Sequence, residues 1–471
     1  MPAPNYTPSQ DFAIVIMAAG KGTRLKSTRA KVLHEIGGRP LLAHVVDAAK
    51  RVLAADDIYV VIGHQANDVE AAVGPMGVQF IMQPEQRGTG HAIMCAGPRV
   101  EGYRNLLVLS GDVPLILPET ILSLRDFHLA EKAAMTILTA EPVDPTGYGR
   151  VIRAGGHRVK AIVEQKALTK SQQKLREINS GIYVFAVKPL LAYIDRLGND
   201  NAHGEFYLTD MAAVLVRAKA KVVATKAADP GEVLGANTLA ELASLDASLR
   251  ARKCADLMAS GVVIYRPETS VIDSEAEIAP DTVIEPFVQI LGKSSIAAGC
   301  RIRSFSVISN SQIGGNVTVR PGCILDQSKV GAGALLGPYS HLRPGSEIGE
   351  GAHVGNFVET KKARLGRGAK ANHLTYLGDA EIGAGVNVGA GTITCNYDGE
   401  AKHVTVIEDG AFIGSDATLV APVRIGKDAY IAAGSTITDD VPAESLALGR
   451  ARQVTKQGWA GKRKAEKVAG S

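Results

Sequence analysis

The stretch LLGPYSHLRPGSEIGEGAHV, residues 335–354, carries an aliphatic side chain at every sixth position, namely Leu336, Leu342, Ile348 and Val354. A spacing of six fits neither the 3.6-residue period of a helix nor the two-residue alternation of strands in a β-sandwich. It is typical of a hexapeptide β-helix, in which each hexad supplies one short strand and one corner. The aliphatic residue is then expected to fill the interior of the prism.

The same six-residue spacing of aliphatic side chains, which we call the six-residue beat, extends from residue 278 to residue 437 with one interruption. Random sequence does not hold one period for about 160 residues, so the pattern is a strong prediction of fold. Glycine repeatedly follows the aliphatic residue, and we expect it to form tight corners because it tolerates a positive φ. The other positions on the beat are Ile278, Ile284, Ile290, Ile296, Ile302, Ile308, Ile313, Val319, Leu325, Val330, Ile407, Ile413, Leu419, Ile425, Ile431 and Ile437.

Before this region, from residue 12 to about residue 235, short apolar runs alternate with segments of helical spacing. Such alternation predicts an α/β domain with a mostly parallel sheet, whose ligands bind at the carboxyl ends of the strands. The expected strands are FAIVIM (12–17), DIYVVIG (57–63), VQFIMQ (78–83), NLLVLSGD (105–112), AMTILTAE (134–141) and GIYVFA (181–186).

Residues 238–259 place leucines three and four positions apart, which predicts one long amphipathic helix with a possible cap at Asn237. The expected organisation is an α/β domain over 1–236, a linker helix over 237–260, a β-helix domain over 261–450 and a basic tail over 451–471. The basic residues of that tail are expected to form a solvated end.

The composition of the chain argues against several classes of protein. The five cysteines among 471 residues are widely spread with no CxxC pair, which argues against a disulfide framework or a zinc site and favours a reducing cytoplasm. The net charge of +4 is modest for this length, whereas a nucleic-acid binder would show a concentrated basic face, so no nucleic-acid partner is expected. The apolar run at residues 12–19 is too short for a membrane span, and residues 1–11 lack signal-peptide features. No membrane association is expected.

Three motifs in the first half suit a phosphorylated ligand. MAAGKGTRL (17–25) follows the first strand, where Gly20 and Gly22 could turn backbone N–H groups toward a phosphate, although a GxG is often only a tight turn. QPEQRGTGHA (83–92) offers amide and hydroxyl groups suited to reading a base edge. Asp112 ends a strand where a metal–phosphate complex could be held, and a plain turn residue is the alternative.

The segment KANHLTYLGD (370–379) keeps the beat through Ala371. Asn372 is expected at a corner with positive φ, since asparagine tolerates that conformation, and His373 is expected to point outward. Basic residues within a few coils and an insertion at 395–405 accompany it. A histidine there suits general-base chemistry near neutral pH, and a solvated surface histidine is the alternative.

The order of these motifs, together with the β-helix, resembles the family of bifunctional N-acetylglucosamine-1-phosphate uridylyltransferases / glucosamine-1-phosphate N-acetyltransferases over residues 11–455. The resemblance implies a Rossmann-like α/β nucleotidyltransferase domain, a linker helix and a left-handed parallel β-helix. It also implies acetylation of glucosamine-1-phosphate by acetyl-CoA, and then UMP transfer from UTP to N-acetylglucosamine-1-phosphate with Mg²⁺ and release of pyrophosphate. The product would supply peptidoglycan and lipopolysaccharide precursors, and the β-helix would form a homotrimer.

The resemblance also assigns residues. Those for UTP and the sugar nucleotide are Ala18, Ala19, Gly20, Arg24, Lys31, Gln83, Gly88, Thr89, Gly149, Glu164, Asn179 and Asn237, with Asp112 and Asn237 as ligands of Mg²⁺. His373 is implied as the general base of acetyl transfer. The sugar phosphate there is assigned to Arg343, Lys361, Tyr376 and Asn387, and acetyl-CoA to Ala390, Asn396, Tyr397, Ser415, Ala433 and Arg450. Ala30 and Ser110 depart from the family pattern, which commonly has Pro and Tyr there, without removing a charge.

Two other functions compete with this one. A pyrophosphorylase with a merely regulatory or oligomerising β-helix would give no reason for His373, Tyr376 and the Asn396–Tyr397 pair to occur together. A non-catalytic scaffold that binds sugar nucleotides is disfavoured because Asp112 and Asn237 are both present.

Overall fold

The structure, a computed structural model, describes residues 11–201 and 204–469. The chain divides into two compact units, Met1–Leu249 and Arg250–Ser471, and each is considered by itself. Residues 1–10, on which the expectation of no signal peptide rests, lie outside the described part of the chain.

The first unit is built on a nine-stranded sheet with the order β5-β4-β1-β6-β10-β7-β11-β9-β8. All six expected strands are present, and β8, β9 and β11 are additional. The expectation of a mostly parallel sheet is only half right, because β10 runs antiparallel to β6 and β7, and β9 runs antiparallel to β8 and β11. The strands are β1 Phe12–Met17, β4 Ile58–Ile62, β5 Gln79–Met82, β6 Asn105–Ser110, β7 Met135–Ala140, β8 Arg150–Gly155, β9 Arg158–Val163, β10 Ile178–Ala186 and β11 Val222–Lys226, with a separate small hairpin of β2 Glu35–Ile36 and β3 Arg39–Pro40.

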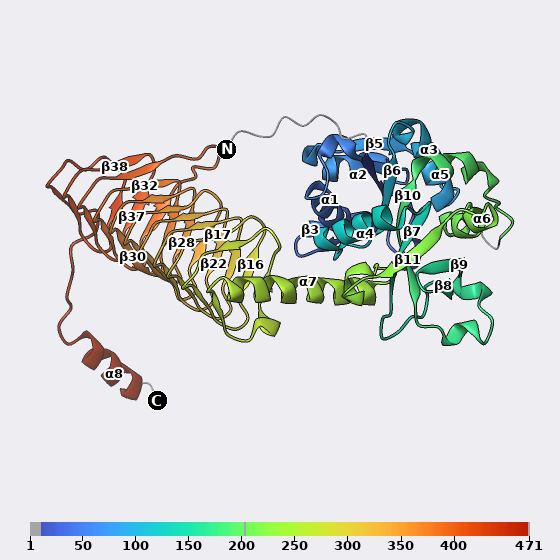
Figure 1. The fold of residues 1–471 in the computed structure, drawn as a ribbon. Helices are drawn as coiled ribbons and strands as arrows, with labels where there is room; N and C mark the ends of the chain where they lie inside the picture. The colour runs from blue at the N-terminus through green and yellow to red at the C-terminus, as the bar shows by residue number, and fades with distance from the viewer. Residues whose placement is uncertain (1–10, 202–203, 470–471) are drawn as a thin grey trace. The chain divides into compact units, whose positions relative to one another are not determined.

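Helices cover both faces of this sheet (Figure 1). Along β1, Ile14 and Ile16 belong to one core cluster, whereas Ala13 and Val15 belong to the other. Alternate residues of the strand thus pack into two different cores, and this is why the whole run is apolar. Residues of α1, α2 and α4 lie in the first cluster, and residues of α3, α5 and α6 in the second. The helices are α1 Leu41–Lys50, α2 Ala66–Val73, α3 Thr89–Val100, α4 Pro118–Glu131, α5 Val187–Tyr193 and α6 Met211–Arg217.

The predicted long helix is α7, Leu239–Ala259. The expectation that Asn237 caps it is wrong. The Thr238 Oγ1 accepts from the Glu241 N–H at 3.2 Å, and a Glu241 carboxylate oxygen accepts from the N–H groups of Thr238 and Asn237. This reciprocal pair is a capping box. It leaves the side chain of Asn237 available for another role.

The second unit is a parallel β-helix whose coils each contribute strands to three sheets (Figure 1). We call these sheets faces 1, 2 and 3. Face 1 consists of β12 Val263–Ile264, β15 Val283–Ile284, β18 Arg301–Ile302, β21 Thr318–Val319, β24 Leu335–Leu336, β27 His353–Asn356, β30 Lys370–His373, β33 Asn387–Val388, β36 Phe412–Ile413, β39 Tyr430–Ile431 and β41 Leu446–Ala447.

Face 2 consists of β13 Val271–Ile272, β16 Gln289–Leu291, β19 Val307–Ser309, β22 Ile324–Asp326, β25 His341–Leu342, β28 Glu359–Lys361, β31 Tyr376–Gly378, β34 Ile393–Cys395, β37 Thr418–Val420 and β40 Thr436–Ile437. Face 3 consists of β14 Glu277–Ile278, β17 Ser295–Ile296, β20 Gln312–Ile313, β23 Lys329–Val330, β26 Glu347–Ile348, β29 Arg364–Leu365, β32 Ala380–Ile382, β35 Thr405–Ile407 and β38 Val423–Ile425.

The predicted interior positions are confirmed. Every aliphatic residue on the six-residue beat is buried, and the most exposed of them, Ile278, is 8% exposed. The beat also continues through the interruption, where threonine or alanine occupies some interior positions and leucine, isoleucine or valine the others. These buried residues are Thr360, Leu365, Ala371, Leu377, Ile382, Val388 and Thr394.

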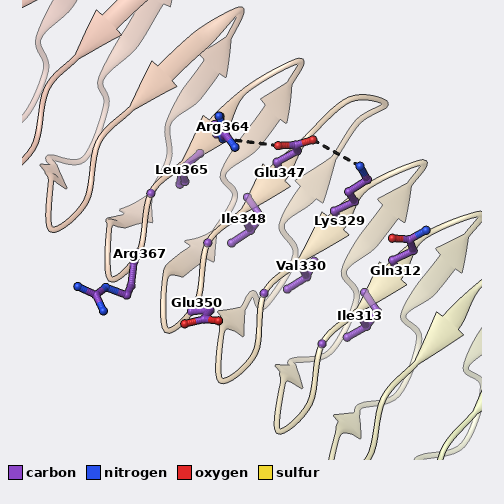
Figure 2. Close-up of a pocket in the computed structure, with 14 residues that line it drawn as sticks. Gln312, Ile313, Lys329, Val330, Glu347, Ile348, Glu350, Arg364, Leu365 and Arg367 are labelled. Carbon is purple, nitrogen blue, oxygen red and sulfur yellow. Dashed lines mark ion pairs between the residues drawn. The ribbon is translucent and has the colours of Figure 1, made fainter.

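Most of the glycines that follow the aliphatic residues do not make the corners, so that expectation is largely wrong; Gly337, which follows Leu336 and has a φ of +83°, is an exception. Gly349 has no positive φ, and a Cβ there would lie 2.7 Å from the carbonyl carbon of Gly366 in the next coil. Close approach of successive coils therefore requires these glycines. The positive φ falls two residues later, as at Gly351 (φ +63°). A hollow of about 630 Å³ lies along the glycines of successive coils, Gly314, Gly331, Gly349 and Gly366. Beside it Glu347 pairs with Lys329 at 3.7 Å and with Arg364 at 3.6 Å, as the dashed lines in Figure 2 mark.

Asn372 likewise does not occupy a left-handed corner. It lies within β30, and the positive φ falls on Leu374 (φ +48°). Leu374 shares its place in the coil with a line of large apolar residues at the corner between faces 1 and 2. We call this line the apolar ridge, and it comprises Phe287, Phe305, Tyr339, Phe357 and Leu374, all more than half exposed.

The basic tail contains a helix, α8 Trp459–Ala469, whose described side chains are all exposed. Within the described residues, no helix combines the length and apolar character needed to cross a membrane.

Candidate functional sites

A cavity of about 610 Å³ lies at the carboxyl ends of β1 and β6 in the first unit. The Gly-rich loop after β1, the loop after β5 and the end of β6 form its walls. Nine of the predicted nucleotide-site residues meet there, namely Ala18, Ala19, Gly20, Arg24, Lys31, Gln83, Gly88, Thr89 and Asp112. The expectation that ligands would bind after these strands thus corresponds to a real hollow.

Two glycines of the loop after β1 shape this wall in different ways. Gly22 has a φ of +62°, and a Cβ there would lie 2.5 Å from the Cβ of Lys31. Only glycine lets the loop close over Lys31 in this way. Nothing lies within 4 Å of the position that a Cβ on Gly20 would take, so its backbone is open to a ligand.

Asn237, which the sequence places 206 residues after Lys31, joins this wall through its side chain. Its Oδ1 accepts from Lys31 Nζ at 3.0 Å and from Arg24 Nη2 at 2.7 Å. Lys31 Nζ also forms an ion pair with the carboxylate of Asp112. Burial would raise the pKa of Asp112, but the Lys31 ammonium and the hydrogen bonds from Lys31 and Ser110 outweigh burial and hold this pKa below its ordinary value.

The oxygen atoms of Asp112 and Asn237 therefore converge on one cationic group, the Lys31 ammonium. A carboxylate and an amide oxygen are suitable ligands for a hard divalent cation. Among the described residues there is no cluster of three or more His, Cys, Asp or Glu side chains that could hold a metal. Two protein oxygens fit a Mg²⁺ ion that draws its other ligands from phosphates and water.

The predicted sugar-binding residues adjoin one another. Asn179 N–H donates to the Gly149 carbonyl at 2.9 Å, and a Cβ on Gly149 would lie 3.6 Å from Glu164 Oε1. Burial raises the pKa of Glu164, although Thr209 Oγ1 donates to this carboxylate at 3.2 Å. These three residues do not line the 610 Å³ cavity.

Sequence reasoning missed Ser110 and Glu205 as lining residues of the cavity, and it included Gln86 only as part of the motif at 83–92. Ser110 appeared only as a departure from the family pattern, yet its side chain reaches Asp112. Glu205 lies far along the chain, and no sequence signal places it near Gly88, where a Cβ would lie 2.9 Å from the Cβ of Glu205.

In the second unit, His373 is exposed, as predicted. Its Nδ1 lies 2.6 Å from Asn356 Oδ1, which belongs to the preceding coil. An amide oxygen only accepts, so Nδ1 carries the proton and Nε2 is left with a free lone pair. Asn356 was not among the residues predicted from the sequence, although it lies one coil, or 17 residues, before His373.

Three of the six predicted acetyl-CoA residues, Ala390, Ser415 and Ala433, fall on one line with His373. The interior residues Ala371, Val388, Ile413 and Ile431 pair in register from coil to coil, and His373 lies two residues beyond the first of them. We call the positions two residues beyond these the His373 column. Its members, in order along the axis, are Asn356, His373, Ala390, Ser415 and Ala433. Arg450 lies beside its end, since a Cβ on Gly434 would lie 3.9 Å from Arg450 Cδ.

The predicted phosphate residues lie on face 2. Arg343 and Lys361 occupy equivalent places in adjacent coils, and Arg343 pairs with Glu359 at 2.8 Å. Gly378 is the next residue in this register. A Cβ there would overlap Tyr376 Oη and lie 2.8 Å from Asn396 Nδ2, so only glycine leaves room for both side chains beside it.

Lys402 is the residue here that sequence reasoning missed. It belongs to the insertion that breaks the six-residue beat, and its ammonium, more than Arg343, lowers the pKa of Lys361. Two lysines held side by side form a natural site for a doubly charged phosphate. An antiparallel bridge places Tyr397 opposite Lys402, and the Tyr397 hydroxyl donates to Gly399 O within the insertion. Asn387 lies in register with Lys370 on face 1.

Comparisons with known proteins agree with this arrangement. Residues 14–253 match the MobA-like NTP transferase domain family, and residues 327–362 and 405–439 match the bacterial transferase hexapeptide (six repeats) family. The chain is 61% identical to the bifunctional protein GlmU of Koribacter versatilis over 98% of this chain and 99% of the relative. It is 48% identical to the bifunctional protein GlmU of Pelobacter propionicus over 96% of this chain and 98% of the relative. The chain belongs to the bifunctional GlmU family.

The expected family, fold class and enzyme class are thereby confirmed. The first unit is the nucleotidyltransferase part, and the hexapeptide matches identify the second unit as the left-handed parallel β-helix of the GlmU family. The chain is a bifunctional transferase with uridylyltransferase and acetyltransferase activities in the synthesis of UDP-N-acetylglucosamine. The scaffold without catalysis and the merely regulatory β-helix are both excluded by this membership.

Proposed function

We propose that acetyl transfer takes place beside the His373 column, with His373 as the general base. The observation that carries this proposal is the column itself. Downstream of His373 it contains only Ala390, Ser415 and Ala433, small side chains on coils spaced by roughly 4.8 Å. An extended chain such as the pantetheine arm of acetyl-CoA can lie along that line, with its thioester at His373 and Arg450 near its far end.

In the proposed reaction, the amine of glucosamine-1-phosphate attacks the thioester carbonyl carbon. Nε2 of His373 takes the amine proton as the new C–N bond forms and the C–S bond breaks. That proton then passes to the departing thiolate, which leaves as the CoA thiol. Asn356 keeps Nδ1 protonated and the ring oriented, so the lone pair of Nε2 faces outward from the column.

The sugar phosphate is proposed to bind on face 2, one corner away from His373. Arg343, Lys361 and Lys402 supply positive charge there, and the shift in the pKa of Lys361 supports a site that gains from an anion. Tyr376 and Asn396, which both lie beside Gly378, are proposed to contact the sugar. The proposed roles of Asn387 and Tyr397 rest on the family resemblance alone.

Uridylyl transfer is proposed to occur in the cavity of the first unit. A phosphate oxygen of N-acetylglucosamine-1-phosphate attacks the α-phosphorus of UTP, the bond to the β-phosphate oxygen breaks, and pyrophosphate leaves. The open backbone at Gly20 and the charges of Arg24 and Lys31 bind the phosphates, and Gln83, Gly88 and Thr89 bind the base. Asp112 and Asn237 would hold Mg²⁺, which neutralises phosphate charge when bound. Gly149, Glu164 and Asn179 are proposed to hold the sugar.

The hexapeptide family match favours an oligomer, and we propose the homotrimer that the resemblance implies. The apolar ridge supports this proposal, because a second copy could cover its five large exposed side chains. Phe287 stacks on Phe305 with ring centroids 5.2 Å apart, and Tyr339 on Phe357 at 5.7 Å, which makes the ridge nearly continuous. The domain limits of residues 236, 260 and 450, and the cytoplasmic location, remain predictions.

The direct test is to incubate the protein with glucosamine-1-phosphate, acetyl-CoA, UTP and Mg²⁺ while free thiol and pyrophosphate are followed separately. The proposal predicts thiol release without UTP, and pyrophosphate release only once the acetylated sugar phosphate is present. Pyrophosphate release from glucosamine-1-phosphate without acetyl-CoA would contradict the proposed order.

A further inference from the structure

His91, in the first turn of α3, lies between the proposed base-reading residue Gln83 and a cysteine. Its Nδ1 is 3.1 Å from Gln83 Nε2 and 3.0 Å from the carbonyl oxygen of Glu85. Its Nε2 is 3.8 Å from Cys95 Sγ. Gln83 itself is only 3% exposed, and its Nε2 also donates to Gly88 O at 3.1 Å.

Nδ1 can satisfy only one of its two neighbours. The Gln83 amide nitrogen only donates, whereas the Glu85 carbonyl only accepts. With the ring proton on Nε2, that nitrogen donates to Cys95 Sγ and Nδ1 accepts from Gln83, so every neighbour except Glu85 O is served. With the proton on Nδ1, the ring donates to Glu85 O and Nε2 can accept from the Cys95 thiol, but the buried Gln83 amide loses its acceptor. The cost of leaving a buried donor without this partner favours the first arrangement.

In the first arrangement both hydrogens of the Gln83 amide are used, one by Gly88 O and one by His91 Nδ1. The amide cannot rotate without losing both bonds. Gln83 lines the cavity, and its Oε1 accepts none of the hydrogen bonds described for this part of the chain. Oε1 is therefore the atom that Gln83 offers to a base, and it is an acceptor.

We propose that His91 is a positioning residue that fixes the amide orientation of Gln83 and thereby selects a pyrimidine with a protonated N3. Uracil presents an N3–H donor, whereas the N3 of cytosine is an acceptor, so a locked Oε1 favours UTP over CTP. This inference rests on the proposed function, in which Gln83 reads the base of the nucleoside triphosphate. His91 contacts no substrate in this account and acts through Gln83.

The test compares His91→Phe and His91→Asn in pyrophosphate release with N-acetylglucosamine-1-phosphate and either UTP or CTP. Phenylalanine keeps the ring volume but removes the acceptor, so KM for UTP should rise about tenfold with kcat within about a factor of two. The ratio of kcat/KM for UTP to that for CTP should fall about tenfold. Asn Oδ1 can replace Nδ1 as the acceptor, so His91→Asn should retain most of the wild-type selectivity.

Two controls accompany these variants. His157→Phe replaces an exposed histidine that does not line the cavity and should leave both nucleotides unaffected. Urea unfolding followed by circular dichroism, measured on the same preparations, reports that each variant is folded.

Equal selectivity of His91→Phe and wild type, or equal loss in His91→Phe and His91→Asn, would overturn the inference while leaving the proposed function intact. Failure of the wild-type protein to release pyrophosphate from UTP would instead overturn the proposed function, and the inference with it.

Discussion

His373 Nδ1 lies 2.6 Å from Asn356 Oδ1, its partner in register on the preceding coil of the β-helix. The β-helix sets this relationship, because equivalent positions in successive coils are held roughly 4.8 Å apart by the ladder of parallel strands. A long loop would not hold a histidine and its partner in this way. The β-helix therefore fixes the tautomer of His373, the proposed base.

Replacing Asn356 by Ala should remove the acceptor that fixes the tautomer of His373. Partners that orient a catalytic or metal-bound histidine typically contribute 10- to 100-fold, so we expect acetyl transfer to fall by roughly that factor in kcat. Asn356→Asp keeps an acceptor at Nδ1 and should retain most activity, with the lower limb of the pH–rate profile moved to higher pH because a carboxylate favours the charged imidazolium. Thiol release measured across pH checks both variants, and wild-type rates in Asn356→Ala would refute the role.

Lys402→Ala tests whether the insertion completes the phosphate site. Removal of one of three cations should raise KM for glucosamine-1-phosphate by about tenfold, with little change in KM for acetyl-CoA. Lys427→Ala, at another exposed lysine of the β-helix unit, is the matched control and should behave as wild type. Equal effects of the two substitutions would mean that Lys402 acts only through general charge.

Asn237→Ala tests the cation site of the first unit. Loss of one of the two converging oxygens should raise the Mg²⁺ concentration needed for half-maximal pyrophosphate release by at least about tenfold. The neighbouring Thr238→Ala removes the helix cap instead, and should lower stability by about 1 kcal/mol without changing the Mg²⁺ requirement. Titration of activity with Mg²⁺, alongside urea unfolding, separates the two roles, and an unchanged requirement in Asn237→Ala would remove it from the metal site.

His128 predicts a pH dependence of stability. The side chain is 2% exposed, its Nδ1 lies 2.8 Å from Thr136 Oγ1, and burial lowers its pKa to about 4. The folded state therefore favours the neutral ring. Its contribution is present above the unfolded pKa of about 6.5 and is lost as pH falls from there toward 4, which amounts to about 2 kcal/mol between pH 7 and pH 5.

Urea unfolding at pH 7 and pH 5, followed by helical circular dichroism, checks this prediction. Glutamine has no group that titrates in this range, so His128→Gln should lose about 2 kcal/mol less unfolding free energy than wild type over the same interval. Parallel curves for the two proteins would show that His128 is not the group responsible.

The sequence predicted the β-helix in detail because its interior accepts one side chain per hexad, and that constraint leaves a period in the sequence. The finer features of the coil could not be predicted in the same way. Glycine after the aliphatic residue was interpreted as a corner, whereas at Gly349 the requirement is the backbone of the next coil, 2.7 Å from a hypothetical Cβ. Only the distance between successive coils distinguishes a glycine required by a corner from a glycine required by the close approach of the next coil.

The nucleotide site was predicted where its residues belong to one motif and missed where they converge from afar. The loop after β1 was read directly, but Glu205 reaches the cavity from a segment without a recognisable pattern. Asn237 was assigned to two roles at once, as helix cap and as metal ligand. Its hydrogen bonds to Arg24 and Lys31, and the capping by Thr238, exclude the first role.

Lys402 and Asn356 show two different limits in the second unit. Lys402 lies in the insertion, where loss of the beat removes any means of placing a side chain from sequence. Asn356 could have been found, because it lies 17 residues before His373 and therefore at the same place in the preceding coil. A search for polar residues one coil away from a candidate base would have detected it.

The central claim is that one chain carries two separate chemistries, each dependent on its own residues. The most direct measurement follows thiol and pyrophosphate release by His373→Ala and Asp112→Ala, each supplied with the substrates of both reactions. We predict that His373→Ala loses acetyl transfer by roughly 10² to 10⁴ and keeps pyrophosphate release from UTP and N-acetylglucosamine-1-phosphate, whereas Asp112→Ala shows the reverse. Retention of both activities by either variant, or loss of both in a folded protein, would contradict the account.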